Sequence, residues 1–126
     1  MPIQGKKRIL AIVDDLFFRV KIEAAAKHQG LPIDFVQTEK DALAKAAEDP
    51  LLIILDLNCS SVQPLDMIAA LKANEGTKGI SLLGYVSHVQ GELKQSAHDA
   101  GCDMVMARSA FSLNLPQILK RYAGAA

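Results

Sequence analysis

The sequence predicts an α/β fold, a five-stranded doubly wound parallel sheet flanked by five helices, in a single domain over residues 1–126. Short aliphatic runs alternate with helix-forming segments about every 20 to 25 residues, which is typical of repeated strand–helix units. The runs show no polar alternation, as expected for strands that are buried on both faces of a parallel sheet. Each return to a parallel strand requires a crossover, so helices are expected on both faces.

The expected elements follow one another in strict order along the chain. Strands are expected near residues 8–13, 33–37, 51–55, 80–86 and 103–107. Helices are expected near residues 16–29, 39–48, 65–74, 91–100 and 115–123. Gly30 and Pro32 end the first helix, because Gly suits the position after a C-cap and Pro cannot continue a helix.

Cap and turn residues mark the other boundaries. Thr38 begins a segment that resembles a capping box at the start of the second helix, and Asp49-Pro50 stops that helix. Gly101 ends the fourth helix. Asn114 is expected to cap the last helix, with Pro116 in its first turn.

The bulk properties exclude several classes of protein. The chain has 14 acidic and 14 basic residues, so no overall field attracts it to nucleic acid or acidic lipid, and we expect neither as a partner. No apolar stretch approaches the length of about 18 residues that spans a bilayer, and no secretory segment precedes the first strand. Cys59 and Cys102 imply no disulfide framework, and a cytoplasmic protein is expected.

Acidic residues follow two of the aliphatic runs. Ile9 to Val13 is followed by Asp14 and Asp15, and Leu51 to Leu55 is followed by Asp56. The carboxyl ends of parallel strands meet at one edge of the sheet, so the three acids are expected to lie close together.

Clustered acids of this kind favour a divalent cation. Two carboxylates about 4 Å apart repel by about 4 kcal/mol at an effective dielectric of about 20, and a bound cation removes that repulsion. Mg²⁺ suits a site of one or two carboxylates, a backbone carbonyl and waters, with room for phosphate oxygens. The alternative is that Asp14 and Asp15 only cap the helix that begins at Leu16, where acids favour the helix dipole.

Two further polar residues follow strands of the same sheet. Ser87 comes 31 residues after Asp56 and follows the fourth strand, and Arg108 comes 52 residues after Asp56 and follows the fifth. An acidic pair, an Asp, a hydroxyl and a cation at successive strand ends resemble the receiver domain of two-component response regulators. The resemblance covers nearly the whole chain. It implies a flavodoxin-like fold with the strand order 2-1-3-4-5.

The resemblance also implies a role for each residue. Asp56 is the expected phosphoryl acceptor, and Ser87 donates its hydroxyl to a phosphoryl oxygen. Asp15 is expected to bind Mg²⁺ directly, and Asp14 through water or as a supporting charge. The backbone carbonyl of Asn58 supplies a further metal ligand, and Asp56 completes the set.

The implied function is that of a stand-alone response regulator. It would receive a phosphoryl group from a histidine kinase or phosphotransfer protein and signal through protein contacts made by its fourth helix, fifth strand and fifth helix. Its only reactions would be magnesium-dependent self-phosphorylation and self-dephosphorylation, so no separate enzyme activity is expected. The alternative is a receiver-like docking module that does not switch by phosphorylation. A P-loop nucleotidase is disfavoured because the chain lacks the Gly-x-x-x-x-Gly-Lys-Ser/Thr loop.

The chain departs from the family pattern after its fifth strand, where a Lys-Pro step is usual. Counting from Gly101 places Arg108 at the Lys position and Ser109 at the Pro position. Matching Phe111 to the usual Phe instead places Ser109 at the Lys position. We prefer the first register, because a cation there balances the carboxylates. Arg has a larger planar fork than the Lys ammonium and favours bidentate contacts.

The aromatic residues near the site also depart from the pattern. Val105 stands where the family usually has an aromatic residue that reports phosphorylation. Tyr85 lies one strand over and could substitute for that aromatic residue, but strand alternation predicts that it packs against a helix instead. His88 follows Ser87 where a small residue is usual, and it either narrows the site, contacts the phosphoryl group, or lies in solvent. Of Phe17 and Phe18, one is expected to face the sheet and the other the solvent.

Overall fold

The computed structural model describes residues 7–87 and 91–125. Its sheet is parallel and has the strand order β2-β1-β3-β4-β5. The strands are β1 (Ile9–Ile12), β2 (Ile33–Val36), β3 (Leu52–Asp56), β4 (Ser81–Val86) and β5 (Met104–Ala107). The helices are α1 (Leu16–His28), α2 (Glu39–Ala46), α3 (Pro64–Ala73), α4 (Gly91–Ala100) and α5 (Arg108–Ala125). The expected doubly wound parallel sheet is confirmed.

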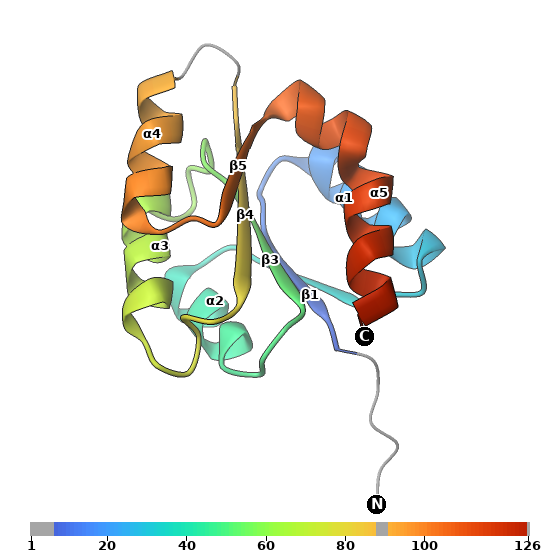
Figure 1. The fold of residues 1–126 in the computed structure, drawn as a ribbon, viewed down its shortest axis with the longest axis horizontal. Coiled ribbons are helices and arrows are strands. Elements are labelled where there is room, and N and C mark those ends of the chain that lie inside the picture. The colour runs from blue at the N-terminus through green and yellow to red at the C-terminus, as the bar shows by residue number, and fades with distance from the viewer. Residues whose placement is uncertain (1–6, 88–90, 126) are drawn as a thin grey trace, which may run out of the picture.

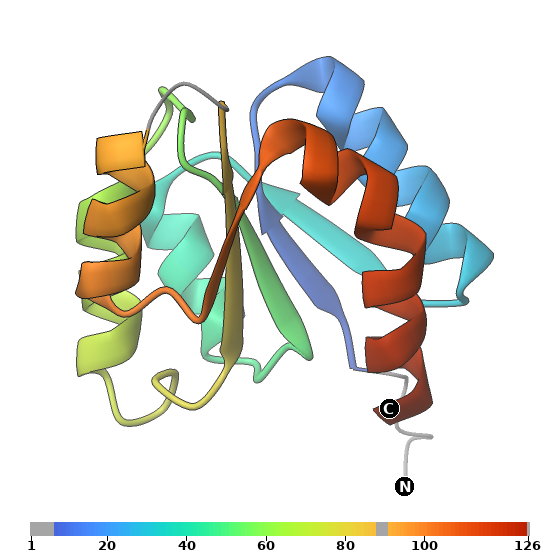
Figure 2. The same ribbon diagram turned by 45° about the horizontal axis from the view of Figure 1, so that its top comes forward.

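The helices cover both faces of the sheet. Helices α1 and α5 lie side by side on one face, and α2, α3 and α4 lie on the other (Figures 1 and 2). Two apolar cores result, one beneath each layer of helices. Every residue of β1 and β3 is buried, because these central strands meet apolar side chains on both faces.

The helix ends follow the local signals in the sequence. Thr38 caps α2, and its hydroxyl accepts a hydrogen bond from the Asp41 backbone N–H at 3.0 Å. Gly30 (φ 71°) and Gly101 (φ 115°) follow α1 and α4 in the left-handed region, which glycine adopts without steric cost.

The last helix begins seven residues earlier than expected, at Arg108 rather than residue 115. Asn114 is not its N-cap, since its side chain donates a hydrogen bond to the Ala110 carbonyl at 2.8 Å, and Pro116 lies inside the helix. The helix extends through this segment because an apolar stripe at a spacing of four residues packs onto the sheet. The stripe consists of Phe111, Leu115 and Leu119, each no more than 1% exposed.

The structure bears on two expectations drawn from the composition, those on disulfides and on membrane-spanning segments. Cys59 and Cys102 are buried and form no disulfide. Among the described residues, no helix combines the length and apolar character needed to cross a bilayer.

Candidate functional site

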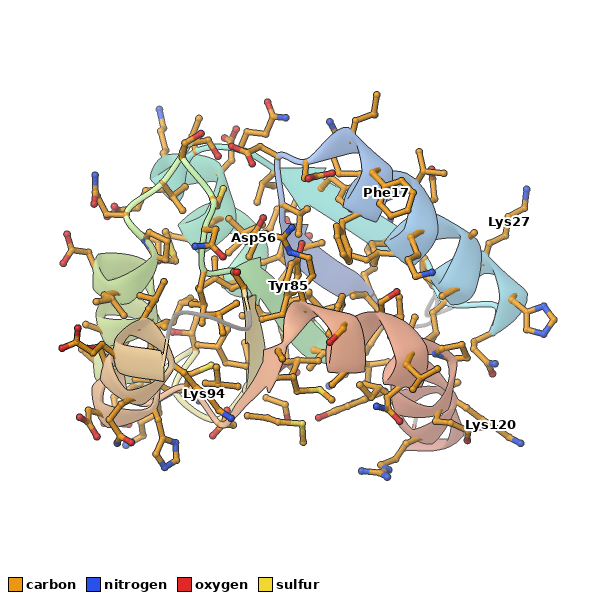
Figure 3. The ribbon with its side chains drawn as sticks, turned by 90° about the horizontal axis from the view of Figure 1, so that it is seen from above. Phe17, Lys27, Asp56, Tyr85, Lys94 and Lys120 are labelled. Carbon is orange, nitrogen blue, oxygen red and sulfur yellow. The ribbon has the colours of Figure 1, made fainter. Side chains whose placement is uncertain are left out.

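Asp56 ends β3 at the edge of the sheet where the strands reach their carboxyl ends (Figure 3). It is one of two buried polar or charged residues in the described chain, with 5% of its surface exposed. Its Oδ1 accepts a hydrogen bond from the Asn58 backbone N–H at 2.8 Å. That contact fixes the orientation of the carboxylate. Within residues 7–87 and 91–125, no hydrogen bond to Oδ2 is found.

The electrostatic surroundings of Asp56 show that the acids act on one another. Burial raises the pKa of Asp56, and the charges of Asp14 and Asp15 raise it further. The hydrogen bond from Asn58 and the positive charge of Arg108 lower the pKa but do not offset the burial. The site therefore holds a carboxylate that its surroundings penalise for being ionised.

Asp14 and Asp15 have different local partners. The Asp14 carboxylate accepts hydrogen bonds from the Ser60 backbone N–H at 3.3 Å and from its hydroxyl at 3.1 Å. Burial alone would raise the pKa of Asp14, but hydrogen bonds, those from Ser60 the largest among them, together outweigh it and lower the pKa. Asp15 caps α1 by accepting a hydrogen bond from the Phe18 backbone N–H at 3.2 Å. Asp15 therefore caps α1, and Asp14 is tied to the loop after β3.

The side chains fit magnesium in chemical type. Three carboxylates and the Asn58 carbonyl are oxygen ligands of the kind Mg²⁺ prefers, and the penalised charge of Asp56 is one that a cation would stabilise. In the described part of the chain, however, no three acidic, His or Cys side chains already form a metal cage. In this structure the Asp14 carboxylate contacts Ser60 and the Asp15 carboxylate caps α1.

Ser87 lies directly after β4, where it was expected. Its backbone N–H donates a hydrogen bond to the Asn58 side-chain oxygen at 3.1 Å. Asn58 thus contacts Asp56 through its backbone and Ser87 through its side chain, and it joins the ends of β3 and β4. Nothing in the sequence predicted this side-chain role. His88 lies outside the described residues.

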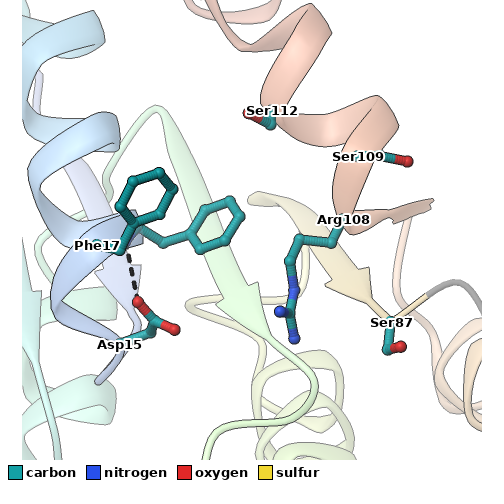
Figure 4. Close-up of a pocket in the computed structure, with 7 residues that line it drawn as sticks. Asp15, Phe17, Ser87, Arg108, Ser109 and Ser112 are labelled. Atoms are coloured by element: carbon teal, nitrogen blue, oxygen red, sulfur yellow. Dashed lines mark hydrogen bonds between the residues drawn. The ribbon is translucent and has the colours of Figure 1, made fainter.

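Arg108 is the first residue of α5, and its side chain reaches into a pocket at the sheet edge (Figure 4). Its guanidinium carbon lies 5.6 Å from the centre of the Phe18 ring, a cation–π contact. Ser109 is exposed and its hydroxyl points away from the guanidinium (Figure 4). Within the described chain Arg108 forms no ion pair with a carboxylate. The pocket is lined by Asp15, Phe17, Phe18, Ser87, Arg108, Ser109 and Ser112.

Three stacked aromatic rings lie beneath the site. Tyr85 is fully buried, with ring centres 5.2 Å from Phe18 on α1 and 4.5 Å from Phe111 on α5. The prediction that Tyr85 packs against a helix is confirmed. Phe18 faces the sheet and Phe17 is 70% exposed, so the expected division of this pair is also confirmed. The part played by Phe111 was not predicted, because its segment was not expected to be helical.

No protein-family model matches the chain, and no curated protein matches it by sequence. Solved structures match it closely in shape. The receiver domain of a sensor histidine kinase from Pseudomonas aeruginosa, with magnesium coordinated in its active site cleft, has a TM-score of 0.79 at 18% identity. That match covers 95% of this chain and 99% of that one.

Two other solved structures extend the comparison. A chemotaxis response regulator of Vibrio cholerae has a TM-score of 0.78 at 20% identity, covering 94% of this chain and 99% of that one. A phosphorylated cyanobacterial phytochrome response regulator has a TM-score of 0.76 at 20% identity, covering 93% of this chain and 91% of that one. With its five parallel strands in the order 2-1-3-4-5 and its five helices, this chain has the fold of response-regulator receiver domains.

Proposed function

We propose that this protein is a response-regulator receiver that accepts a phosphoryl group on Asp56 from a histidine kinase or phosphotransfer protein. The observation that carries the proposal is the environment of Asp56. A nearly buried carboxylate, oriented by the Asn58 N–H, lies at a sheet edge within the electrostatic reach of Asp14, Asp15 and Arg108. A cluster of charges around a buried carboxylate does not serve the packing of an apolar core. Phosphoryl transfer, in contrast, requires a positioned nucleophile and nearby charge compensation.

The transfer needs little from the protein except positioning. Oδ2 of Asp56 attacks the phosphorus of a phosphohistidine in line, the new O–P bond forms, and the N–P bond breaks with its electron pair returning to the imidazole nitrogen. The guanidinium of Arg108 supplies positive charge near the added phosphoryl oxygens, and the Ser87 hydroxyl donates to one of them. Beyond self-phosphorylation and hydrolysis of the acyl phosphate, we propose no further catalytic activity.

We propose Mg²⁺ as the cofactor, held by Asp14, Asp15, Asp56 and the backbone carbonyl of Asn58. The ion would supply charge neutralisation for the phosphoryl oxygens. The support is the oxygen donor set at the sheet edge and the burial and acidic neighbours that raise the pKa of Asp56.

Two surfaces suit the partners of this function. Leu16, Phe17 and Val20 of α1 are 70%, 70% and 58% exposed beside the pocket, which supports contact with the donor at its rim. The downstream partner would bind the surface formed by α4, β5 and α5. A groove between α4 and β5, lined by Gly91, Lys94, Gln95, His98, Asp103 and Val105, supports that assignment.

The test is labelling by a small phosphodonor. Wild-type protein is incubated with acetyl phosphate with and without Mg²⁺, and intact mass spectrometry counts the added phosphoryl groups. One group is expected on the wild type with Mg²⁺ and none on Asp56→Asn. Asp99→Asn, an exposed acid on α4, is the matched control and is expected to label normally. Labelling that persists in Asp56→Asn would refute the nucleophile assignment.

The second candidate is a receiver-like docking module that does not switch by phosphorylation. The observation in its favour is that Asp14 and Asp15 are engaged by Ser60 and by the α1 backbone. Backbone NMR with Mg²⁺ and then a phosphoryl mimic separates the two functions. Shifts through Ser87 and residues 105–122 are expected of a switch, and shifts confined to the metal ligands of a docking module.

A further inference from the structure

Two buried polar atoms in the described chain have no hydrogen-bond partner, the hydroxyl of Tyr85 and Nε of Arg108. Buried donors without partners are rare in folded proteins because the lost hydration is not replaced. Both atoms lie at the same edge of the sheet. A Phe ring would make the same stack as Tyr85 without the unsatisfied hydroxyl, so the packing alone does not account for a tyrosine here.

Tyr85 lies directly across from the phosphoacceptor on the neighbouring strand. Asp56 and Tyr85 are register partners across β3 and β4, so their side chains lie on the same face of the sheet. Figure 3 shows the two residues next to each other at the centre of the molecule, seen from above. Burial raises the pKa of Tyr85, and the negative charge of Asp56 raises it further, so the phenol keeps its proton.

The ring cannot leave this position without breaking the stack. Its ring centre lies 5.2 Å from that of Phe18 and 4.5 Å from that of Phe111, which are themselves 6.4 Å apart, and the residue has no exposed surface. The Arg108 guanidinium lies over the Phe18 ring, so both unpartnered donors are held by the same aromatic group. The donors are therefore organised before any ligand arrives.

We propose that the Tyr85 hydroxyl and Arg108 Nε together bind the oxygens of the phosphoryl group carried by Asp56, and that Tyr85 senses phosphorylation. This inference rests on the proposed function. An N–H and an O–H donor match a tetrahedral oxyanion, which offers several acceptor oxygens close together. Because the Tyr85 ring joins β4 to α1 and α5, occupancy of the site is transmitted to the packing of those two helices. That route takes the place of an aromatic residue on β5, where this chain has Val105.

The test uses beryllium fluoride with Mg²⁺ as the phosphoryl mimic and the variant Tyr85→Phe, which keeps the ring stack. Binding is measured by ¹⁹F NMR titration. Loss of one hydrogen bond to a charged acceptor is expected to weaken binding by about tenfold or more. Tyr122→Phe is the matched control, since Tyr122 is the only other tyrosine of the chain, and it is expected to bind as wild type does.

A second readout separates sensing from simple stability. In protein labelled with ¹³C at the phenol carbon of tyrosine, the Tyr85 resonance is expected to shift when the mimic binds, while that of Tyr122 stays in place. Arg108→Met, alone and combined with Tyr85→Phe, completes a double-mutant cycle in which the two losses are expected to be non-additive because both donors share one anion.

The outcomes distinguish this inference from the proposed function. If wild type binds the mimic and Tyr85→Phe binds it equally well, the sensing role of Tyr85 is overturned while the phosphoacceptor function stands. Strictly additive losses in the cycle would overturn the shared site. If wild type neither binds the mimic nor is labelled on Asp56, the proposed function and this inference fail together.

Discussion

Replacing Asp56 by Asn is expected to stabilise the folded protein at neutral pH. The carboxylate is 5% exposed, and the Asn58 hydrogen bond and the charge of Arg108 compensate its burial only in part. The Asn side chain keeps the Oδ1 acceptor and removes the charge. We expect a gain of about 1–2 kcal/mol, a fraction of the several kcal/mol that burying an ion costs.

The expected gain in unfolding free energy corresponds to a rise in the midpoint temperature of unfolding. Unfolding entropy of about 2.1 cal/mol/K per residue gives about 0.26 kcal/mol/K for this chain, so the midpoint should rise by about 4–8 °C. Differential scanning calorimetry in a metal-free buffer at neutral pH measures it. Asp99→Asn, which removes an exposed acid, is the control and should move the midpoint little.

The sign of the pH dependence follows from the raised pKa of Asp56. Between the ordinary Asp pKa of about 3.9 and the raised folded value, the folded state binds more protons than the unfolded state, so wild-type stability falls as pH rises. The advantage of Asp56→Asn should be complete above the folded pKa and vanish below about pH 3.9. A variant less stable than wild type at neutral pH, or an advantage that is independent of pH, would refute this account of the site.

Three further substitutions test the packing around the site. Phe111→Ala should destabilise the protein by about 3–5 kcal/mol in urea unfolding, since it removes a fully buried ring; a loss below about 1 kcal/mol would contradict its place in the core. Gly101→Ala should destabilise it by about 1–3 kcal/mol, because φ is 115° and a Cβ would lie 2.9 Å from Cγ of Lys72. Thr77→Val should cost about 1–2 kcal/mol, because the buried hydroxyl donates to the Leu71 carbonyl at 2.6 Å; unchanged stability would show that this carbonyl finds another donor.

Much of the fold could be predicted because its signals are local. The apolar runs of β1 and β3 are short and continuous, and Gly30, Thr38 and Gly101 mark helix ends through their own backbone and side-chain chemistry. Local signals also led to the wrong predicted start of α5. Asn114 and Pro116 resemble a helix start, but the packing of Phe111 against Tyr85 depends on a strand far away in the sequence.

The features of the site also fall into those that the sequence predicts and those that it does not. That acids follow β1 and β3 could be seen in the sequence, because parallel strands bring their carboxyl ends to one edge. The hydrogen bond of Asp14 to Ser60, and that of Ser87 to the Asn58 side chain, could not be seen. Each joins loops that are close in space and separate in sequence, and loop conformation depends on the elements packed beneath it.

The sequence by itself determined the alternation of strands and helices, the burial of the central strands and the chemistry at the sheet edge. These properties depend on residue type and on short-range periodicity. The tertiary structure alone decided where α5 begins, which groups the acids contact, and that the hydroxyl of Tyr85 and Nε of Arg108 are buried without a hydrogen-bond partner among the described residues. Such outcomes depend on how side chains from α1, β4 and α5 fill a shared volume, and no local stretch of sequence contains that information.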